Sequence, residues 1–386
     1  MLALRLTRGT HPLVLVRRLL VAAASAGVGF LLLAALGYAS AHPASAGSVL
    51  RLLWCFIPLA ATVQFAVAVA RTDPSTRPRP GLSSLGLGPA RLSVLAAVST
   101  AISTTLGSMV ALLFFLHLRG DLTGMPFDGG AAEFLGAGTP LPLAAALMLL
   151  ALVPVTAATA SALALRSRPD PARDTFGSEE LPEPAPAPTG LPWGVALTAA
   201  GLAVEAYASR GTAGHAFPLP GRFDATPVAV LAGWTLTATG LAMAGPALTH
   251  LCGRALQAVR PGAVRLLAGR VLMDEARRLG RPLGVVCAVM AAVVAASALY
   301  AGDERPWGPL TALGAVLVLG CTAATLLTSA LEAKQARAHT AEALLRMGAP
   351  ASVPRKAAAL RAAALVALFA PLTWAIAELA ALPLAK

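Results

Sequence analysis

About nine long apolar stretches divide this chain, and nearly every lysine and arginine lies in alternate gaps between them. A stretch of about 18 or more apolar residues can cross the ~30 Å hydrocarbon core of a bilayer as a helix. Inside lipid each backbone polar group must pair within its own segment, so such stretches have to be helical. The pattern therefore predicts an all-α polytopic membrane protein.

The composition agrees with a membrane protein, because only 12% of residues are charged and 57% are hydrophobic. A soluble domain carries roughly 25% charged residues. The net charge of +12 could suggest nucleic acid, but basic residues at span ends are what sets membrane topology. We therefore expect no nucleic-acid partner.

The nine predicted spans form two pseudo-repeated halves, and ten is the alternative count. The spans are Leu19–Tyr38, Val49–Ala70, Leu92–Leu116, Leu141–Leu165, Leu191–Ala208, Pro227–Leu251, Pro282–Tyr300, Leu310–Leu331 and Ala358–Leu382.

The basic residues predict the orientation, because lysine and arginine are enriched in cytoplasmic loops. Of the 30 lysines and arginines, all but six lie in the N-terminal segment or in alternate gaps and span ends on the same side of the membrane. The six exceptions are Arg51, Arg119, Arg210, Arg222, Arg305 and Lys386. We expect a multi-pass protein of the cell membrane with a cytoplasmic N-terminus and an external C-terminus. A cleaved signal peptide ending near Ala39-Ser40-Ala41 is the alternative interpretation of the first span.

Four regions follow from the spans and from one proline-rich stretch. Residues 1–166 form a first half with four spans, and residues 261–386 form a second half with three. Residues 167–190 include alternating prolines, which forbid a helix and favour a stiff cytoplasmic linker. Residues 191–260 form a two-span connector.

Two cytoplasmic loops share a short pattern that supports the repeat. Leu85, Gly86 and Gly88 precede Pro89 in the first half, and Leu345-Arg346-Met347-Gly348 precedes Pro350 in the second. Matched patterns in matched places are typical of transporter-like bodies with internal symmetry.

Two polar segments of the second half are predicted to be helices outside the hydrocarbon. Residues 331–348 are unusually polar, Glu342 and Arg346 are spaced to pair across one turn, and Gly348 is a natural stop. This segment is either a connector or a lever pushed by a cytoplasmic partner. The other segment, Gly262–Arg281, is basic and amphipathic, so it is predicted to lie on anionic lipid. Its lipid-facing cations are Arg265, Arg270, Arg277 and Arg278.

Polar residues within the predicted spans are few. Ser99, Ser103 and Gly107 recur every fourth residue in the third span, a spacing that favours close helix packing and leaves a polar path as the alternative. Glu205 near the outer end of the fifth span is a functional candidate by default, unless it reaches water.

No motif for catalysis, cofactor binding or metal binding occurs in the sequence. It has no phosphate-binding loop, no HExxH, no CxxC and no GxSxG. The four cysteines read as small apolar residues rather than disulfides or metal ligands. We therefore expect no enzymatic activity from this chain alone, no cofactor and no metal.

The segment from Ala341 to Ala349 resembles the cytoplasmic signature of the FtsX-like permease family, in which a Glu and a Leu-Arg stretch close on Gly-Ala before a span. Gly253-Arg254, Gly269-Arg270 and Glu275 to Arg278 also look like that family's second half. The family's large extracellular domain is missing, since only about Gly302–Trp307 separates spans seven and eight.

The resemblance implies the membrane subunit of an ABC transporter with a separate ATP-binding subunit in the cytoplasm. It implies that Glu342, Leu345, Arg346 and Gly348 touch that ATPase, with Leu85, Gly86 and Gly88 as counterparts. The implied function is movement of a hydrophobic or amphipathic substrate, or mechanical transmission. The implied assembly is a homodimer or a pseudo-symmetric monomer. A secondary transporter and a non-catalytic membrane scaffold are the alternatives.

Overall fold

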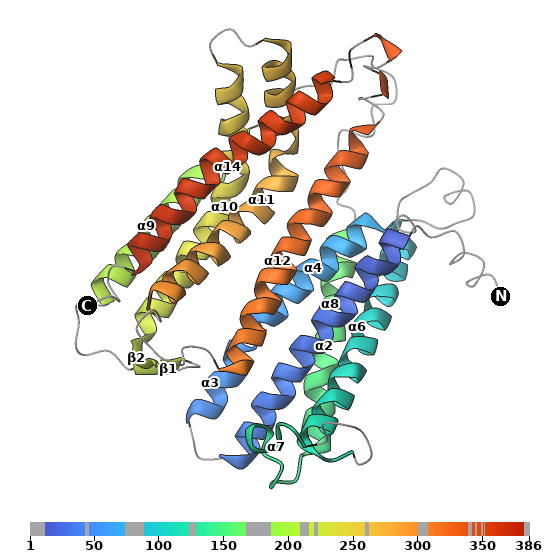
Figure 1. The fold of residues 1–386 in the computed structure, drawn as a ribbon, viewed down its shortest axis with the longest axis vertical. Helices are drawn as coiled ribbons and strands as arrows, with labels where there is room; N and C mark the ends of the chain where they lie inside the picture. Colours follow the sequence, from blue (N-terminus) through green and yellow to red (C-terminus); the bar gives the residue numbers. More distant parts are fainter. Residues whose placement is uncertain are drawn as a thin grey trace, which may run out of the picture. The chain divides into compact units, whose positions relative to one another are not determined.

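Helices make up almost all the regular structure, because the apolar stretches allow no other way to pair the backbone within lipid. The computed structural model (Figure 1) describes residues 12–42, 46–73, 89–122, 129–166, 187–208, 216–219, 223–258, 262–299, 308–338, 342–343, 346–348, 350 and 352–381. The predicted all-α class is confirmed for these residues apart from one short β-hairpin. Most of the predicted linker, residues 167–186, lies outside them.

The chain divides into two compact units, residues 1–177 with 307–321 and residues 178–306 with 322–386. The first contains α2 (Pro12–Ala41), α3 (Ala46–Trp54), α4 (Phe56–Thr72), α6 (Pro89–Arg119), α7 (Ala132–Leu135), α8 (Leu143–Leu165) and the start of α12 (Pro309–Ala336). Helices α2, α4, α6 and α8 all contact one another, and α2 also contacts α3 and α7.

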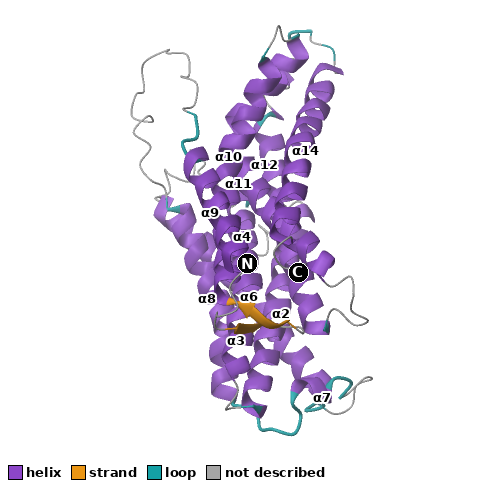
Figure 2. Ribbon diagram, turned by 90° about the vertical axis from the view of Figure 1, so that its left-hand side faces the viewer, coloured by secondary structure: helices purple, strands orange, loops and turns teal. Residues whose placement is uncertain are grey.

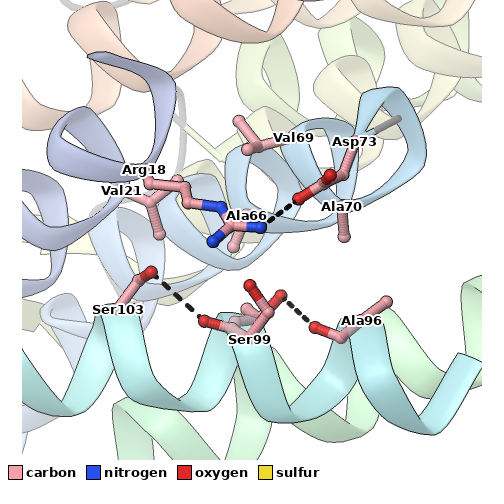
Figure 3. A pocket seen from close by; sticks show the side chains of 10 residues that line it. Arg18, Val21, Ala66, Val69, Ala70, Asp73, Ala96, Ser99 and Ser103 are labelled. Atoms are coloured by element: carbon pink, nitrogen blue, oxygen red, sulfur yellow. Dashed lines mark hydrogen bonds and ion pairs between the residues drawn. The ribbon is translucent and has the colours of Figure 1, made fainter. Parts of the chain in front are cut away.

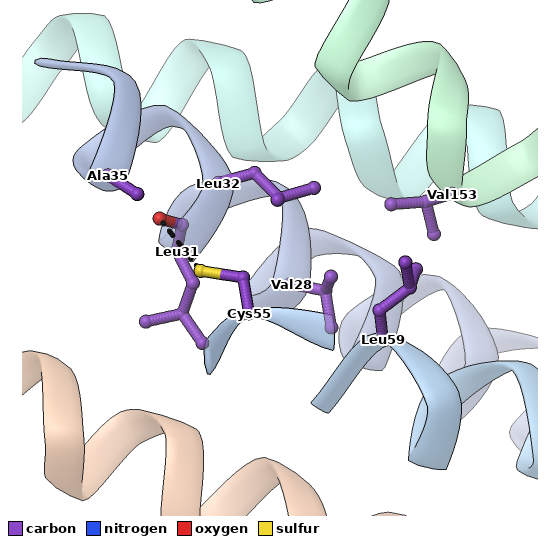
Figure 4. Close-up of a cluster of buried hydrophobic side chains, with 7 residues drawn as sticks. All are labelled: Val28, Leu31, Leu32, Ala35, Cys55, Leu59 and Val153. Carbon is purple, nitrogen blue, oxygen red and sulfur yellow. Dashed lines mark hydrogen bonds between the residues drawn. The ribbon is translucent and has the colours of Figure 1, made fainter. Parts of the chain in front are cut away.

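One cluster of buried side chains shows how α2 organises the first unit (Figure 4). Val28 and Leu32 of α2 pack with Leu59 of α4 and Val153 of α8. Between helices in lipid such contacts stabilise through close packing, because lipid tails are as apolar as leucine.

Small polar residues bring α2, α6 and α8 together, as the spacing in the third span predicts. The Ser25 hydroxyl donates to the Thr104 carbonyl at 2.7 Å, and the Ser108 hydroxyl donates to the Leu150 carbonyl at 3.2 Å. A Cβ on Gly107 would lie 2.8 Å from the Cβ of Ser25, so only glycine permits this approach. The predicted packing role is supported for Gly107, whereas Ser99 and Ser103 line a small pocket between α2, α4 and α6.

The second unit contains α9 (Leu191–Ala208), α10 (Val228–Gln257), α11 (Ala263–Leu299), α14 (Ser352–Ala381) and the end of α12. Strands β1 (Ala216–Leu219) and β2 (Phe223–Pro227), orange in Figure 2, form an antiparallel hairpin between α9 and α10. Helix α10 packs on α9 and α11, and α11 packs on α14. Leu241, Cys287, Phe369 and Ile376 form the core that joins α10, α11 and α14.

The two units differ from the regions expected from the sequence. Helices α9 and α10 were expected to form a separate connector, but they belong to the same unit as α11 and α14. Glycines explain this, because a Cβ on Gly253 would lie 2.8 Å from the Gly269 carbonyl oxygen. Helices α10 and α11 therefore pack backbone against backbone. The pseudo-repeat of two halves stays a prediction.

Seven helical segments of the described residues are long and apolar enough to cross a membrane. They are Val14–Ala41, Arg51–Thr72, Ser93–Arg119, Leu143–Leu165, Ala263–Ser297, Pro309–Ala336 and Ser352–Ala381. Large apolar side chains on their surfaces, such as Met148 at 78% exposure, fit a lipid environment better than water. A multi-pass membrane protein is thus supported, while the count of nine stays a prediction. The two further predicted spans are helices α9 and α10.

Candidate functional site

Three charged side chains, one each from α11 and α14 and one from the residue after α12, gather in the second unit. Arg337, directly after α12, forms an ion pair with Glu275 of α11. Arg361 of α14 is near enough to both to interact with them electrostatically. Its Nη1 atom is buried and has no hydrogen-bond partner among the described residues.

The cluster has two guanidinium groups and one carboxylate, so its positive charge is only half balanced. The Glu275 and Arg337 side chains are 10% and 29% exposed, respectively, which removes much of their hydration. Taking charges out of water is costly unless each one is paired and hydrogen-bonded. The buried nitrogen of Arg361 therefore carries positive charge that no hydrogen bond from the described residues compensates.

The predicted coupling segment, residues 331–348, only partly forms a helix of its own. Helix α12 continues to Ala336, so the first polar residues extend a span. Arg346 then donates to Glu342 at 2.7 Å, which confirms the predicted pairing across one turn. Their side chains are 75% and 59% exposed, so they are open to a partner. Gly348 has a φ of +87°, the left-handed conformation of a helix stop.

Four of the residues assigned to ATPase contact lie outside the described residues. They are Leu345 and the first-half residues Leu85, Gly86 and Gly88. Their proposed role in binding a partner stays a prediction.

The four basic residues assigned to a membrane-surface helix all lie exposed on α11. The boundary expected at Pro282 is absent, because α11 runs as one helix of 37 residues through that proline to Leu299. Such a helix is ~55 Å long, well over the ~30 Å hydrocarbon thickness. The structure therefore places Arg265, Arg270, Arg277 and Arg278 on the extension of a span, rather than on a separate helix lying on the membrane.

A buried carboxyl lies between α9 and α10. Glu205 is 1% exposed, so it does not reach water. The Thr237 hydroxyl donates to its Oε1 atom at 3.3 Å, and its Oε2 atom has no hydrogen-bond partner among the described residues. A Cβ on Gly233 would lie 2.5 Å from the Glu205 Cγ, so glycine makes room for this side chain.

A small polar pocket lies between α2, α4 and α6 of the first unit (Figure 3). The Arg18 guanidinium pairs with the Asp73 carboxylate at 2.5 Å above Ser99 and Ser103. The cavity holds about 20 Å³, room for roughly one water molecule. The pocket is thus too small for a substrate, and its ion pair ties α2 to the end of α4.

Sequence reasoning assigned no site role to Glu275, Arg361 or Asp73, and it named Glu275 only as part of the family resemblance. The one available signal was the position of Arg361, which interrupts an otherwise apolar run from Ala357 to Pro371. Charged residues inside a span are functional candidates by default.

Within the described ranges no group of three or more His, Cys, Asp and Glu side chains could hold a metal ion. Comparison of the chain with known protein families, with curated proteins and with solved structures finds no match.

Proposed function

We propose that this chain is the membrane subunit of an ATP-driven transporter, in which a separate cytoplasmic chain binds and hydrolyses ATP. The observation that carries the proposal is the exposed Glu342–Arg346 turn, which ends at Gly348 between two membrane-crossing helices. The resemblance of this segment to the FtsX-like permease signature supports the same assignment.

The proposal places the protein in the cell membrane with its N-terminus in the cytoplasm. The unequal distribution of lysine and arginine supports this orientation. Glu342, Arg346 and Gly348 then face the cytoplasm, where an ATP-binding subunit can reach them.

The ion pair between Arg337 and Glu275 suggests how a push on this segment travels. It fastens the end of α12 to α11, and α11 packs along α14. A partner that moves residues 342–348 therefore acts on three helices of the second unit together. The proposed substrates are hydrophobic or amphipathic molecules. A homodimer and a pseudo-symmetric monomer are both compatible with this function.

A secondary transporter is the second candidate, because Glu205 is buried. A carboxyl enclosed between membrane helices is costly and is often part of an ion or proton path. Loss of transport on Glu205→Gln without any ATP-binding partner would favour this function.

The test is an exchange of charges, Glu342→Arg with Arg346→Glu. The exchange keeps a pair at the same spacing, whose contribution to the helix is only ~0.2–0.5 kcal/mol, so folding should be unchanged. We expect the tagged wild-type chain to co-purify with an ATP-binding subunit and to hydrolyse ATP only in that complex. The exchange should lower the yield of complex about tenfold or more, which equals ~1.4 kcal/mol of binding.

The matched control exchanges Asp274 and Arg278, which are also exposed and four residues apart on α11. This control should leave the complex intact. Normal complex formation by the Glu342/Arg346 exchange would refute the assigned contact. ATP hydrolysis by the lone, pure chain would refute the proposed function itself.

A further inference from the structure

We propose that the second unit binds one anionic phospholipid, with its phosphate on Arg361 and Arg337 and an acyl chain in the groove between α11 and α14. The proposal concerns a resident lipid and does not depend on the transport function proposed above.

The groove is apolar and open along one side. It has a volume of about 180 Å³ and is lined mainly by Leu283, Val286, Met290, Leu365, Val366 and Phe369. Val366 and Met290 are 65% and 42% exposed, so the groove opens to the surroundings of the helices. The Thr373 hydroxyl at its far end already donates to the Phe369 carbonyl at 2.7 Å. The lining therefore offers hydrocarbon contacts and little else.

The charged cluster lies at the other end of the same groove. Arg361 precedes the lining residue Leu365 by one helical turn, and Glu275 precedes Leu283 by about two turns on α11. A molecule that filled the groove would thus meet Arg361 and Arg337 at its end. An amphipathic molecule matches this site, because its apolar part fits the groove and its anionic head group meets the two arginines.

The length of the site fits one lipid leaflet. Thr373 follows Arg361 by twelve positions, which corresponds to ~18 Å of helix. One leaflet contributes half of the ~30 Å hydrocarbon core, or ~15 Å. A phosphate on Arg361 therefore places an acyl chain along the groove at its natural depth.

The charge of the cluster selects an anion. Glu275 is the one acid among the three groups, and it already pairs with Arg337. The buried Nη1 atom of Arg361 lacks a hydrogen-bond partner among the described residues. Guanidinium groups bind phosphate through paired hydrogen bonds, and basic pockets between membrane helices bind anionic headgroups. An acidic partner protein would satisfy the charge but would leave the groove empty.

The full chain, reconstituted in nanodiscs of equal parts phosphatidylglycerol and phosphatidylcholine and then released, is analysed by native mass spectrometry. We expect the wild type to retain one phosphatidylglycerol about tenfold more often than phosphatidylcholine. Arg361→Gln should abolish this preference. Arg355→Gln, which removes an exposed cation from the same helix, should keep it.

A second pair of variants tests the groove without touching the charges. Ala370 lines the groove and is exposed, so Ala370→Trp should fill the groove and remove the retained lipid. Ala375→Trp, at an exposed position of α14 outside the groove lining, should retain it. Equal retention of both lipids by the wild type would overturn the proposal, and so would unchanged retention in Ala370→Trp. Displacement of the lipid by inorganic phosphate alone would show that the acyl groove contributes nothing, and would also overturn it.

Discussion

Two ion pairs of the second unit use the same chemistry and differ in burial. Arg346 and Glu342 meet at the surface, whereas Arg337 and Glu275 meet where the carboxylate is 10% exposed. An exposed pair four residues apart contributes less than ~0.5 kcal/mol. Removing one partner of a buried pair costs more, because the remaining charge is left without compensation.

Glu275→Ala should therefore lower the unfolding free energy by about 3 kcal/mol, since it leaves two arginines beside each other without an acid. Thermal unfolding of the purified chain in detergent measures this change. Glu342→Ala is the control and should unfold within about 0.5 kcal/mol of the wild type. Equal unfolding temperatures for Glu275→Ala and the wild type would show that the buried pair does not hold α11 to α12.

The sequence predicts only one of these two pairs, and the reason is distance along the chain. Glu342 and Arg346 are four residues apart, so helix geometry alone brings them together. Glu275 and Arg337 are 62 residues apart. Their contact depends on how three helices pack, which no local pattern encodes.

At the scale of elements, the apolar stretches predict that helices form there. They predict less well the residues at which those helices begin and end. The sequence pattern predicts a basic segment that ends at Arg281 and a span that begins at Pro282, a residue type that removes a backbone donor and clashes with the preceding turn. Helix α11 nevertheless continues through it, as membrane helices commonly do when neighbouring groups satisfy the freed carbonyl. The polar segment after α12 was likewise assigned to a separate helix, although α12 continues to Ala336.

Glycine contacts between helices give the prediction that belongs to this scale. A Cβ on Gly233 would lie 2.8 Å from the Gly201 carbonyl oxygen, so Gly233→Ala should force α9 and α10 apart. The expected loss of stability is about 1–3 kcal/mol, measured by thermal unfolding.

Gly320→Ala in α12 is the matched control, because a Cβ there meets nothing within 4 Å. It should raise stability by roughly 0.5–1 kcal/mol, since alanine loses less conformational entropy in a helix. Similar effects from both substitutions would mean that α9 and α10 do not pack through Gly233.

At the scale of the whole molecule, the sequence predicts a membrane protein made of helices, but it does not predict which helices belong to each compact unit. Length and hydropathy are properties of single stretches, so they predict membrane-crossing helices directly. The grouping of α9 and α10 with α11 depends on paired glycine faces, such as Gly253 and Gly269, that look unremarkable along the chain. Seven helices of the described residues are long and apolar enough to cross a membrane, and the distribution of lysine and arginine alone predicts the side on which their ends lie.

The central claim is that the end of the second unit carrying Glu342 and Arg346 faces the cytoplasm, where an ATP-binding chain can reach it. Single cysteines at Met347 and at Ala137, both exposed, test this claim in a variant that lacks the four native cysteines. A membrane-impermeant maleimide should label Ala137→Cys in intact cells and Met347→Cys only after the membrane is permeabilised. Labelling of Met347→Cys in intact cells, with Ala137→Cys protected, would contradict the orientation and the proposed ATPase contact together.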